Sequence, residues 1–156
     1  MDDRIEELPE STCLQLLGSG NVGRVAVNGD PSPVVLPVNY LQHDVGIVFT
    51  TADGAKWDAA REGAPASFEV DGVDPEHRSG WSVLVRGHLA AVDGDAEVAA
   101  EVTEALEPLP GGPRPHVVRL SIDEITGRRV PPDAAWTRAH RSHHTWTGQD
   151  GTDLMG

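Results

Sequence analysis

Apolar residues occur along the chain in short runs that are bounded by glycine, proline, asparagine and aspartate. This pattern favours strands joined by turns over long helices. It predicts strands at residues 23–27, 34–41, 45–50, 65–70, 81–92 and 116–122. The Asn28-Gly29 pair between the first two strands is typical of a hairpin.

Three other segments have a helical pattern, namely residues 11–17, 53–62 and 96–106. Ser11 and Asp53 are placed to cap the first two helices, and Gly18 and Gly63 are placed to end them. The order along the chain is then helix, three strands, helix, two long strands, helix and strand.

Short turns between successive strands favour antiparallel pairing. The sequence therefore predicts a mainly β domain, a small barrel with helices at its ends, over residues 1–130. Residues 131–156 form a polar tail with little apolar content. A chain of 156 residues is long enough to bury a core.

Charge and composition limit the partners and the location. The formal net charge of −13 opposes attraction to nucleic acid or to an anionic membrane surface, so neither partner is expected. No apolar run approaches membrane-spanning length, and residues 1–7 are acidic and lack an apolar signal region. With Cys13 as the lone cysteine, these features predict a cytoplasmic protein.

Residues 18–23 have the glycine spacing of a dinucleotide fingerprint. That motif needs a strand before it and a helix after it, so that the helix N-terminus meets the pyrophosphate. Here the predicted order is reversed, and a turn into the first strand is the better interpretation.

The tail contains His140, His143 and His144, but their spacing matches no standard zinc arrangement, and we expect no metal site. The sequence also shows no recognisable set of nucleophile, histidine and carboxylate, so no catalytic residue is assigned.

Lys56 is the lone lysine beside eleven arginines. It follows a predicted strand that ends in the hydroxyls of Thr50 and Thr51, and it opens a predicted helix after a turn at Gly54. Backbone N–H groups, hydroxyls and a cation at a helix start can hold a phosphate. The same local pattern also fits a surface lysine at a strand–helix junction, and local chemistry leaves both interpretations open.

Several segments together resemble the FMN-binding split barrels related to pyridoxamine 5′-phosphate oxidase, in particular the branch of small proteins that includes nitroimidazole-resistance reductases. The resemblance covers roughly residues 8–130. The matching segments, in chain order, are Gly23-Arg24-Val25, residues 35–40, Thr50-Thr51, Gly54-Ala55-Lys56, residues 66–71 and residues 80–87.

The resemblance implies an antiparallel, Greek-key-like split barrel that forms a homodimer, with the flavin in a groove between the subunits. It places one strand beside the isoalloxazine ring, partly through its backbone groups: Val35, Leu36, Pro37, Val38, Asn39 and Tyr40. It implies Thr50, Thr51 and Lys56 at the flavin phosphate. Ser82, beside Trp81, falls where the family has a polar side chain near the flavin of the partner subunit.

The residue chemistry is consistent with these roles. Pro37 has no N–H and therefore suits a strand edge. Trp81 offers a flat apolar face to a ring system.

Two departures from the oxidases proper make oxidation of pyridoxamine phosphate doubtful. Those enzymes have an arginine immediately before this lysine, where the present chain has Ala55. The phosphate site is then less cationic, unless Arg24, Arg61 or Arg86 reaches it. The residues that hold the substrate phosphate near the C-terminus of the oxidases also have no convincing match.

These observations predict a flavoprotein, an FMN-dependent oxidoreductase that transfers a hydride or electrons between the flavin and a small conjugated or nitro-type acceptor. Other functions stay open at this point. They are a non-catalytic flavin-binding module, the same scaffold with haem or a deazaflavin coenzyme, and a structural dimer with an empty groove.

Overall fold

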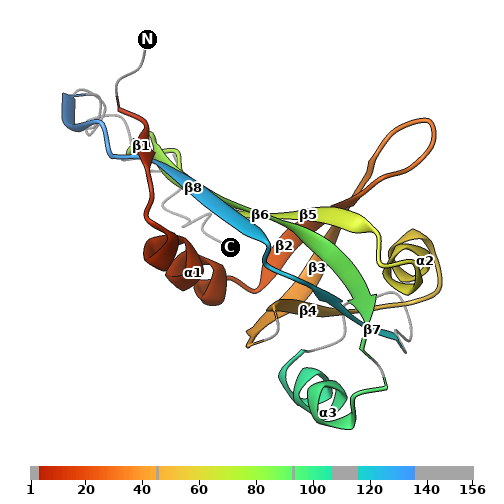
Figure 1. The fold of residues 1–156 in the computed structure, drawn as a ribbon. Helices are drawn as coiled ribbons and strands as arrows, with labels where there is room; N and C mark the ends of the chain where they lie inside the picture. The colour runs from red at the N-terminus through yellow and green to blue at the C-terminus, as the bar shows by residue number, and fades with distance from the viewer. Residues whose placement is uncertain (1–3, 45, 93, 107–115, 136–156) are drawn as a thin grey trace, which may run out of the picture.

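Antiparallel strands close into a barrel in the computed structural model, which describes residues 4–44, 46–92, 94–106 and 116–135 (Figure 1). The described elements, in chain order, are β1 (Glu6–Glu7), α1 (Glu10–Ser19), β2 (Val22–Val27), β3 (Val34–His43), β4 (Gly46–Thr51), α2 (Ala55–Arg61), β5 (Pro65–Asp74), β6 (Ser79–Ala91), α3 (Ala96–Ala105), β7 (His116–Leu120) and β8 (Glu124–Val130).

The sheet has the strand order β1-β8-β6-β5-β2-β3-β4-β7, and an additional pairing of β6 with β7 closes the barrel. Strand β6 changes its partner along its length. Residues 80–86 pair with β8, and residues 89–91 pair with β7. Strands β8 and β1 therefore extend the sheet away from the barrel as an arm, which Figure 1 shows beside the far end of β6. The predicted mainly β split barrel is confirmed.

Alternating side chains of the strands fill the barrel. In β2, for example, Val25 and Val27 are buried, whereas Arg24 is exposed. The rings of Tyr40 and Phe68 meet edge to face with centroids 4.8 Å apart. Fully buried residues from several strands fill the core, including Phe49, Phe68, Val83, Val85, Leu89 and Leu120.

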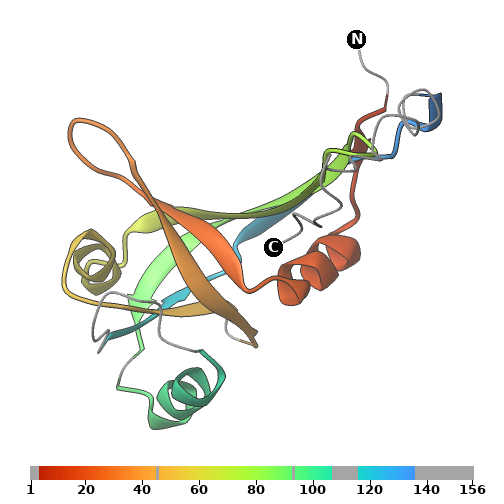
Figure 2. The ribbon, with the colours of Figure 1, turned by 180° about the vertical axis from the view of Figure 1, so that it is seen from behind.

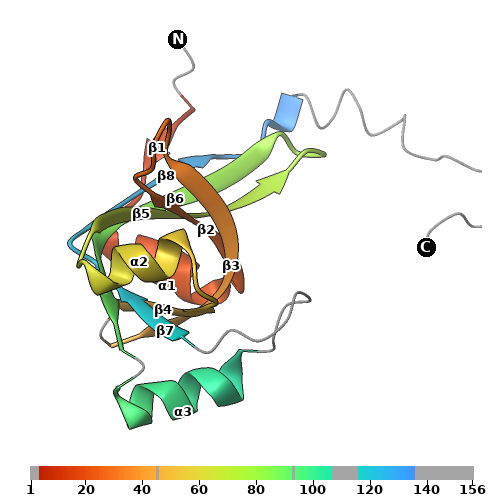
Figure 3. The same cartoon turned by 90° about the vertical axis from the view of Figure 1, so that its right-hand side faces the viewer.

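Helices α1 and α2 lie at opposite ends of the barrel (Figures 2 and 3). The Tyr40 hydroxyl donates a hydrogen bond to the Leu17 carbonyl and so joins α1 to β3. Helix α3 lies outside the barrel, where its apolar side packs on β4 and β7. The side chain of Asp95 caps α3 by accepting from the N–H groups of Glu97 and Val98. Among the described residues, no helix combines the length and the apolar character needed to cross a membrane.

The structure corrects both predicted helix caps. Helix α1 begins at Glu10 after Pro9, so Ser11 lies inside its first turn. Helix α2 begins at Ala55, and its N-cap residue is Gly54. Asp53 therefore does not cap α2; its carboxylate binds a histidine from β7 instead.

The sequence pattern also missed two strands, β1 and β8. Strand β8 contains the polar run Thr126-Gly127-Arg128-Arg129, which gives a weak strand signal. It forms because β6 offers a long edge: seven register pairs join the two strands, from Gly80↔Val130 to Arg86↔Glu124. Gly127 is needed there because a Cβ would lie 2.6 Å from the Cys13 sulfur.

Candidate functional site

Strand β3 changes its pairing partner halfway along its length. Residues 34–39 pair with β2, and the described ladder to β4 begins only at Tyr40. On the side that faces away from β2, the first half of β3 is therefore an open edge. Half of the backbone N–H and C=O groups of a strand point to each side, so such an edge offers polar groups to a ligand. Pro37 lies in this half, where its missing N–H breaks no ladder to β4.

The side chains of the predicted flavin-facing strand divide between two faces. Val35 and Pro37 are exposed on the outside of the barrel, and Val35 retains 60% of its accessible surface. Val38 and Tyr40 are buried in the core, and Leu36 is half-buried on the same side. Val38 and Tyr40 can therefore meet a ligand only through backbone groups. Asn39 is half-buried, and the alternation along β3 places it on the outer face with Val35 and Pro37.

The predicted phosphate-binding residues lie at the end of β4 and the start of α2. Thr50 is half-buried, and Thr51 is buried with its hydroxyl donating to the Ala52 carbonyl at 3.1 Å. Lys56 is half-buried in the first turn of α2. Because the N-cap residue is Gly54, no capping side chain occupies the first N–H groups of α2. Because the helix has only seven residues, we expect the side chains, rather than the helix N-terminus, to bind any anion here.

An imidazole that the sequence analysis did not single out joins this segment to β7. The His116 Nε2 atom lies 2.7 Å from Asp53 Oδ1. The His116 ring also stacks on the indole of Trp57, with centroids 3.8 Å apart and planes 7° from parallel. His116 is 63 residues from Asp53 in the chain, but it pairs with Thr51 at the end of the β4–β7 ladder. Only this strand pairing reveals the contact.

Two arginines proposed to compensate for Ala55 are paired with carboxylates elsewhere. Arg24 lies 3.4 Å from Glu69 and 3.3 Å from Asp71, and the Arg86–Glu124 separation is 3.6 Å. The pKa of Glu69 is raised, first by burial and then by the neighbouring Asp71.

Arg61, the third such arginine, is exposed in the last turn of α2. Within the described residues, the ion pairs of Arg24 and Arg86 thus direct these two cations toward the outer face of the sheet rather than toward Lys56.

Trp81 and Ser82 occupy opposite faces of β6. Trp81 covers Gly72, where an added Cβ would lie 2.6 Å from the indole nitrogen. Ser82 faces outward and lines a groove of about 430 Å³ together with Arg128. The segment after α2 contacts β6 at Leu89, whose N–H donates to the Ala64 carbonyl. Seven residues of strand separate Ser82 from Leu89, roughly 23 Å. Along β6, Ser82 therefore lies well away from the point where the segment after α2 meets this strand.

The outer face of the extended sheet carries exposed apolar side chains among charged ones. Strand register places Pro37, Arg24, Glu69 and Leu84 in one row on this face, because each lies opposite the next on neighbouring strands. Five large apolar side chains are markedly exposed among the described residues: Ile5, Val22, Val35, Val73 and Leu84. Alternation along the strands places four of them on this face, and Ile5 lines the 430 Å³ groove on it. Exposed apolar patches of this kind mark interaction surfaces.

A second groove, of about 590 Å³, lies where β6 changes partner. Its charged lining includes Arg86, His88, Asp123 and Glu124. His88 Nδ1 lies 2.9 Å from Asp123 Oδ2, and this hydrogen bond, followed by that from Ser121, lowers the pKa of Asp123. The Ser121 hydroxyl contacts the backbone of His88, so these groups do not form a nucleophile–base pair.

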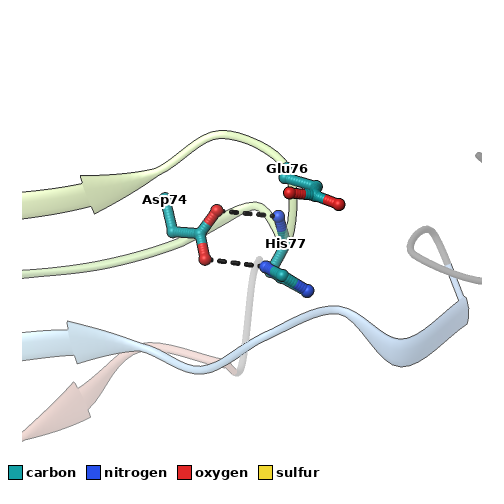
Figure 4. Close-up of side chains that lie close together, drawn as sticks. All are labelled: Asp74, Glu76 and His77. Atoms are coloured by element: carbon teal, nitrogen blue, oxygen red, sulfur yellow. Dashed lines mark hydrogen bonds and ion pairs between the residues drawn. The ribbon is translucent and has the colours of Figure 1, made fainter. Parts of the chain in front are cut away.

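Asp74, Glu76 and His77 come together at the tip of the β5–β6 hairpin (Figure 4). Asp74 accepts hydrogen bonds from the His77 backbone N–H at 3.3 Å and meets His77 Nδ1 at 2.7 Å. The His77 side chain is the main cause of the lowered pKa of Asp74. This is the ordinary way in which an aspartate closes a turn, and the cluster is exposed to solvent.

The barrel and the partner change in β3 define a split-barrel protein, and the chain belongs to the pyridoxamine 5′-phosphate oxidase family. The model of that family matches residues 9–129. The resemblance inferred from the sequence is thereby confirmed. His140, His143 and His144 of the tail lie outside the described residues.

Individual relatives give the same result. The uncharacterized protein Rv0080 of Mycobacterium tuberculosis is 32% identical over 135 residues, which cover 83% of this chain and 88% of the relative. The solved structure of the FAD binding protein from Mycobacterium smegmatis is 33% identical, with a TM-score of 0.64, and the match covers 80% of this chain and 97% of that one.

A candidate 5-nitroimidazole antibiotic resistance protein from Bacteroides thetaiotaomicron has a TM-score of 0.60 over 80% of this chain and 88% of that one. Its sequence is 12% identical, so this likeness shows a shared fold.

Proposed function

We propose that the protein binds FMN and works as an oxidoreductase on small conjugated or nitro-type acceptors. The observation that carries the proposal is the open edge of β3, residues 34–39, beside the end of β4 and the start of α2. An open strand edge supplies backbone donors and acceptors for the ring, and Lys56 with the Thr50 hydroxyl supplies a cation and a donor for a phosphate. The 33% identical relative from Mycobacterium smegmatis is a FAD binding protein, which supports a flavin.

The residues present fit the phosphate end of FMN. The first N–H groups of α2 have no capping side chain, and Lys56 lies among them. Thr51 is less suited to donate, because its hydroxyl already donates to Ala52. One lysine and the half-buried Thr50 match a single terminal phosphate better than the pyrophosphate of FAD.

When bound, flavin supplies hydride and electron transfer. The chain would hold the phosphate through Lys56, orient the ring along the β3 backbone, and shield one side of it with apolar residues.

The proposed active form is a homodimer. Ser82 is roughly 23 Å along β6 from the contact with the segment after α2, which supports a shared groove to which a second copy supplies Ser82. The outer face that holds Ser82 also holds Val35, Leu84 and the other exposed apolar residues. Covering this face with a second copy removes apolar surface from water, which favours association.

The visible spectrum of purified protein that has been incubated with FMN and desalted tests cofactor binding. We expect retention of the flavin bands. A protein that retains no flavin would contradict the proposal, and a Soret band after incubation with haem would favour the haem alternative. Turnover with reduced nicotinamide and a nitroaromatic or quinone acceptor then separates an oxidoreductase from a non-catalytic flavin module.

A further inference from the structure

The Gly54-Ala55-Lys56 segment is held from both sides by one imidazole. Asp53 precedes the segment and Trp57 follows it, and His116 contacts both. The Asp53 side chain is 89% exposed, and that of His116 is 21% exposed. The ring is thus fixed against the end of β7, while the carboxylate it holds reaches into solvent.

At the turn itself, the Asp58 N–H donates to the Gly54 carbonyl, but Gly54 has no side chain that could pack against its surroundings. Gly54 has φ of 146°, a conformation that L side chains rarely adopt, and a Cβ built on it would meet nothing within 4 Å. A glycine in open space adopts many backbone conformations at low cost. The residues on either side of it must therefore define where the first turn of α2 begins. Trp57 packs against the core, and the bond from His116 to Asp53 restrains the other side.

We propose that His116 is a positioning residue for the phosphate end of the flavin site. The proposal rests on the proposed function, because it assumes that Lys56 binds the FMN phosphate. His116 clamps Asp53 and Trp57 to β7 and so holds Lys56 in the geometry that a phosphate needs. It need not touch the cofactor. Without the clamp, the turn at Gly54 samples other conformations, and binding of the phosphate must restrict them.

Comparison of FMN with riboflavin, which lacks the phosphate, separates positioning from general stability. The ratio of the riboflavin Kd to the FMN Kd, measured by flavin fluorescence, reports the contribution of the phosphate. Loss of structure in the groove would weaken both ligands, whereas loss of the clamp would lower the ratio. We expect His116→Ala to reduce it by about tenfold, the size of one charged hydrogen bond.

Asp53→Asn is a variant for which simple electrostatics and the clamp predict opposite changes in the preference for FMN over riboflavin. Simple electrostatics predicts tighter FMN binding, because a negative charge near the phosphate is removed. The clamp predicts a lower FMN preference, because the charged bond to His116 is lost. The site is exposed, so this variant should fold. His116→Phe retains the stack on Trp57 and loses the bond to Asp53, and we expect its ratio to match that of Asp53→Asn.

His77→Gln is the matched control, because His77 has the same 2.7 Å contact with an aspartate at the far hairpin tip. Its ratio should equal that of the wild type. If this ratio is unchanged or higher in Asp53→Asn and unchanged in His116→Ala, the clamp is overturned, while the phosphate site at Lys56 is not. A wild-type protein that binds FMN no better than riboflavin would overturn the phosphate site and the clamp together, and the two failures are thus distinguishable.

Discussion

Gly87 lies directly against the backbone carbonyl of Ser121, and a Cβ at position 87 would overlap that oxygen. This close approach occurs where β6 changes partner from β8 to β7, and the Ser121 N–H donates to the neighbouring carbonyl of His88. The barrel can close at this point because the residue has no side chain.

Gly87→Ala should therefore destabilise the fold by about 1–3 kcal/mol or more, because a backbone carbonyl cannot move aside as a flexible side chain does. Urea denaturation measures the change. Gly94→Ala is the control, since a Cβ at Gly94 meets nothing within 4 Å, and it should change stability little. Equal stability of the two variants would contradict the close-packed closure.

Lys56→Ala should weaken FMN binding by about 1–3 kcal/mol, because a charged hydrogen bond to the phosphate is lost. Titration of apoprotein with FMN measures the effect. Arg61→Ala, at the other end of α2, is the comparison. If the arginine variant loses more affinity than the lysine variant, then the cation has been assigned to the wrong residue.

Tyr40→Phe should cost about 1–3 kcal/mol of stability, because the buried Leu17 carbonyl loses its donor. FMN affinity should stay unchanged, since the Tyr40 side chain points into the core.

Burial raises the pKa of Tyr40, and the tyrosine contributes stability below its ordinary pKa that is lost as the pH rises through the folded value. As the pH rises above roughly 10, the wild type should therefore lose more stability than Tyr40→Phe. Denaturation curves that fall equally in this range would contradict the assignment.

The carboxyl of Asp123 should titrate at lower pH than an ordinary aspartate, because its ionised form is hydrogen-bonded to His88 and then to Ser121. A depressed pKa gives stability that is present above the ordinary value and is lost as the pH falls through the folded one. Carboxyl NMR of the variants measures the shift. We expect His88→Ala to raise the pKa of Asp123 more than Ser121→Ala does, and the reverse order would be inconsistent with this bonding.

Leu84→Asp should shift the proposed dimer to monomer, because a charge would be buried where the second copy covers the outer face. Light scattering coupled to size-exclusion chromatography gives the molar mass. Glu104→Arg, on the exposed side of α3, should leave the mass unchanged. A monomeric wild type would refute the proposed dimer, and a Leu84→Asp variant that remains dimeric would place the interface elsewhere.

The strands and helices with strong periodicity could be predicted from the sequence. Val98 and Val102, for example, follow helical spacing and do pack on the β4–β7 sheet. Only part of the candidate site could be predicted from the sequence. Thr50, Thr51 and Lys56 are neighbours in the chain, so their proximity is local, whereas His116 joins them through the β4–β7 pairing. Strand β8 was missed because its alternation is weak and its stability comes from the edge of β6.

The sequence by itself determined the alternation of apolar and polar positions, and with it six of the eight described strands. It also placed a lone cation after two hydroxyls, because those groups are consecutive in the chain. The tertiary structure alone decided that Asp53 binds His116 rather than capping α2, and that β3 leaves its first half unpaired on one side. Both depend on strand register, which brings distant residues together by backbone pairing that no local pattern encodes.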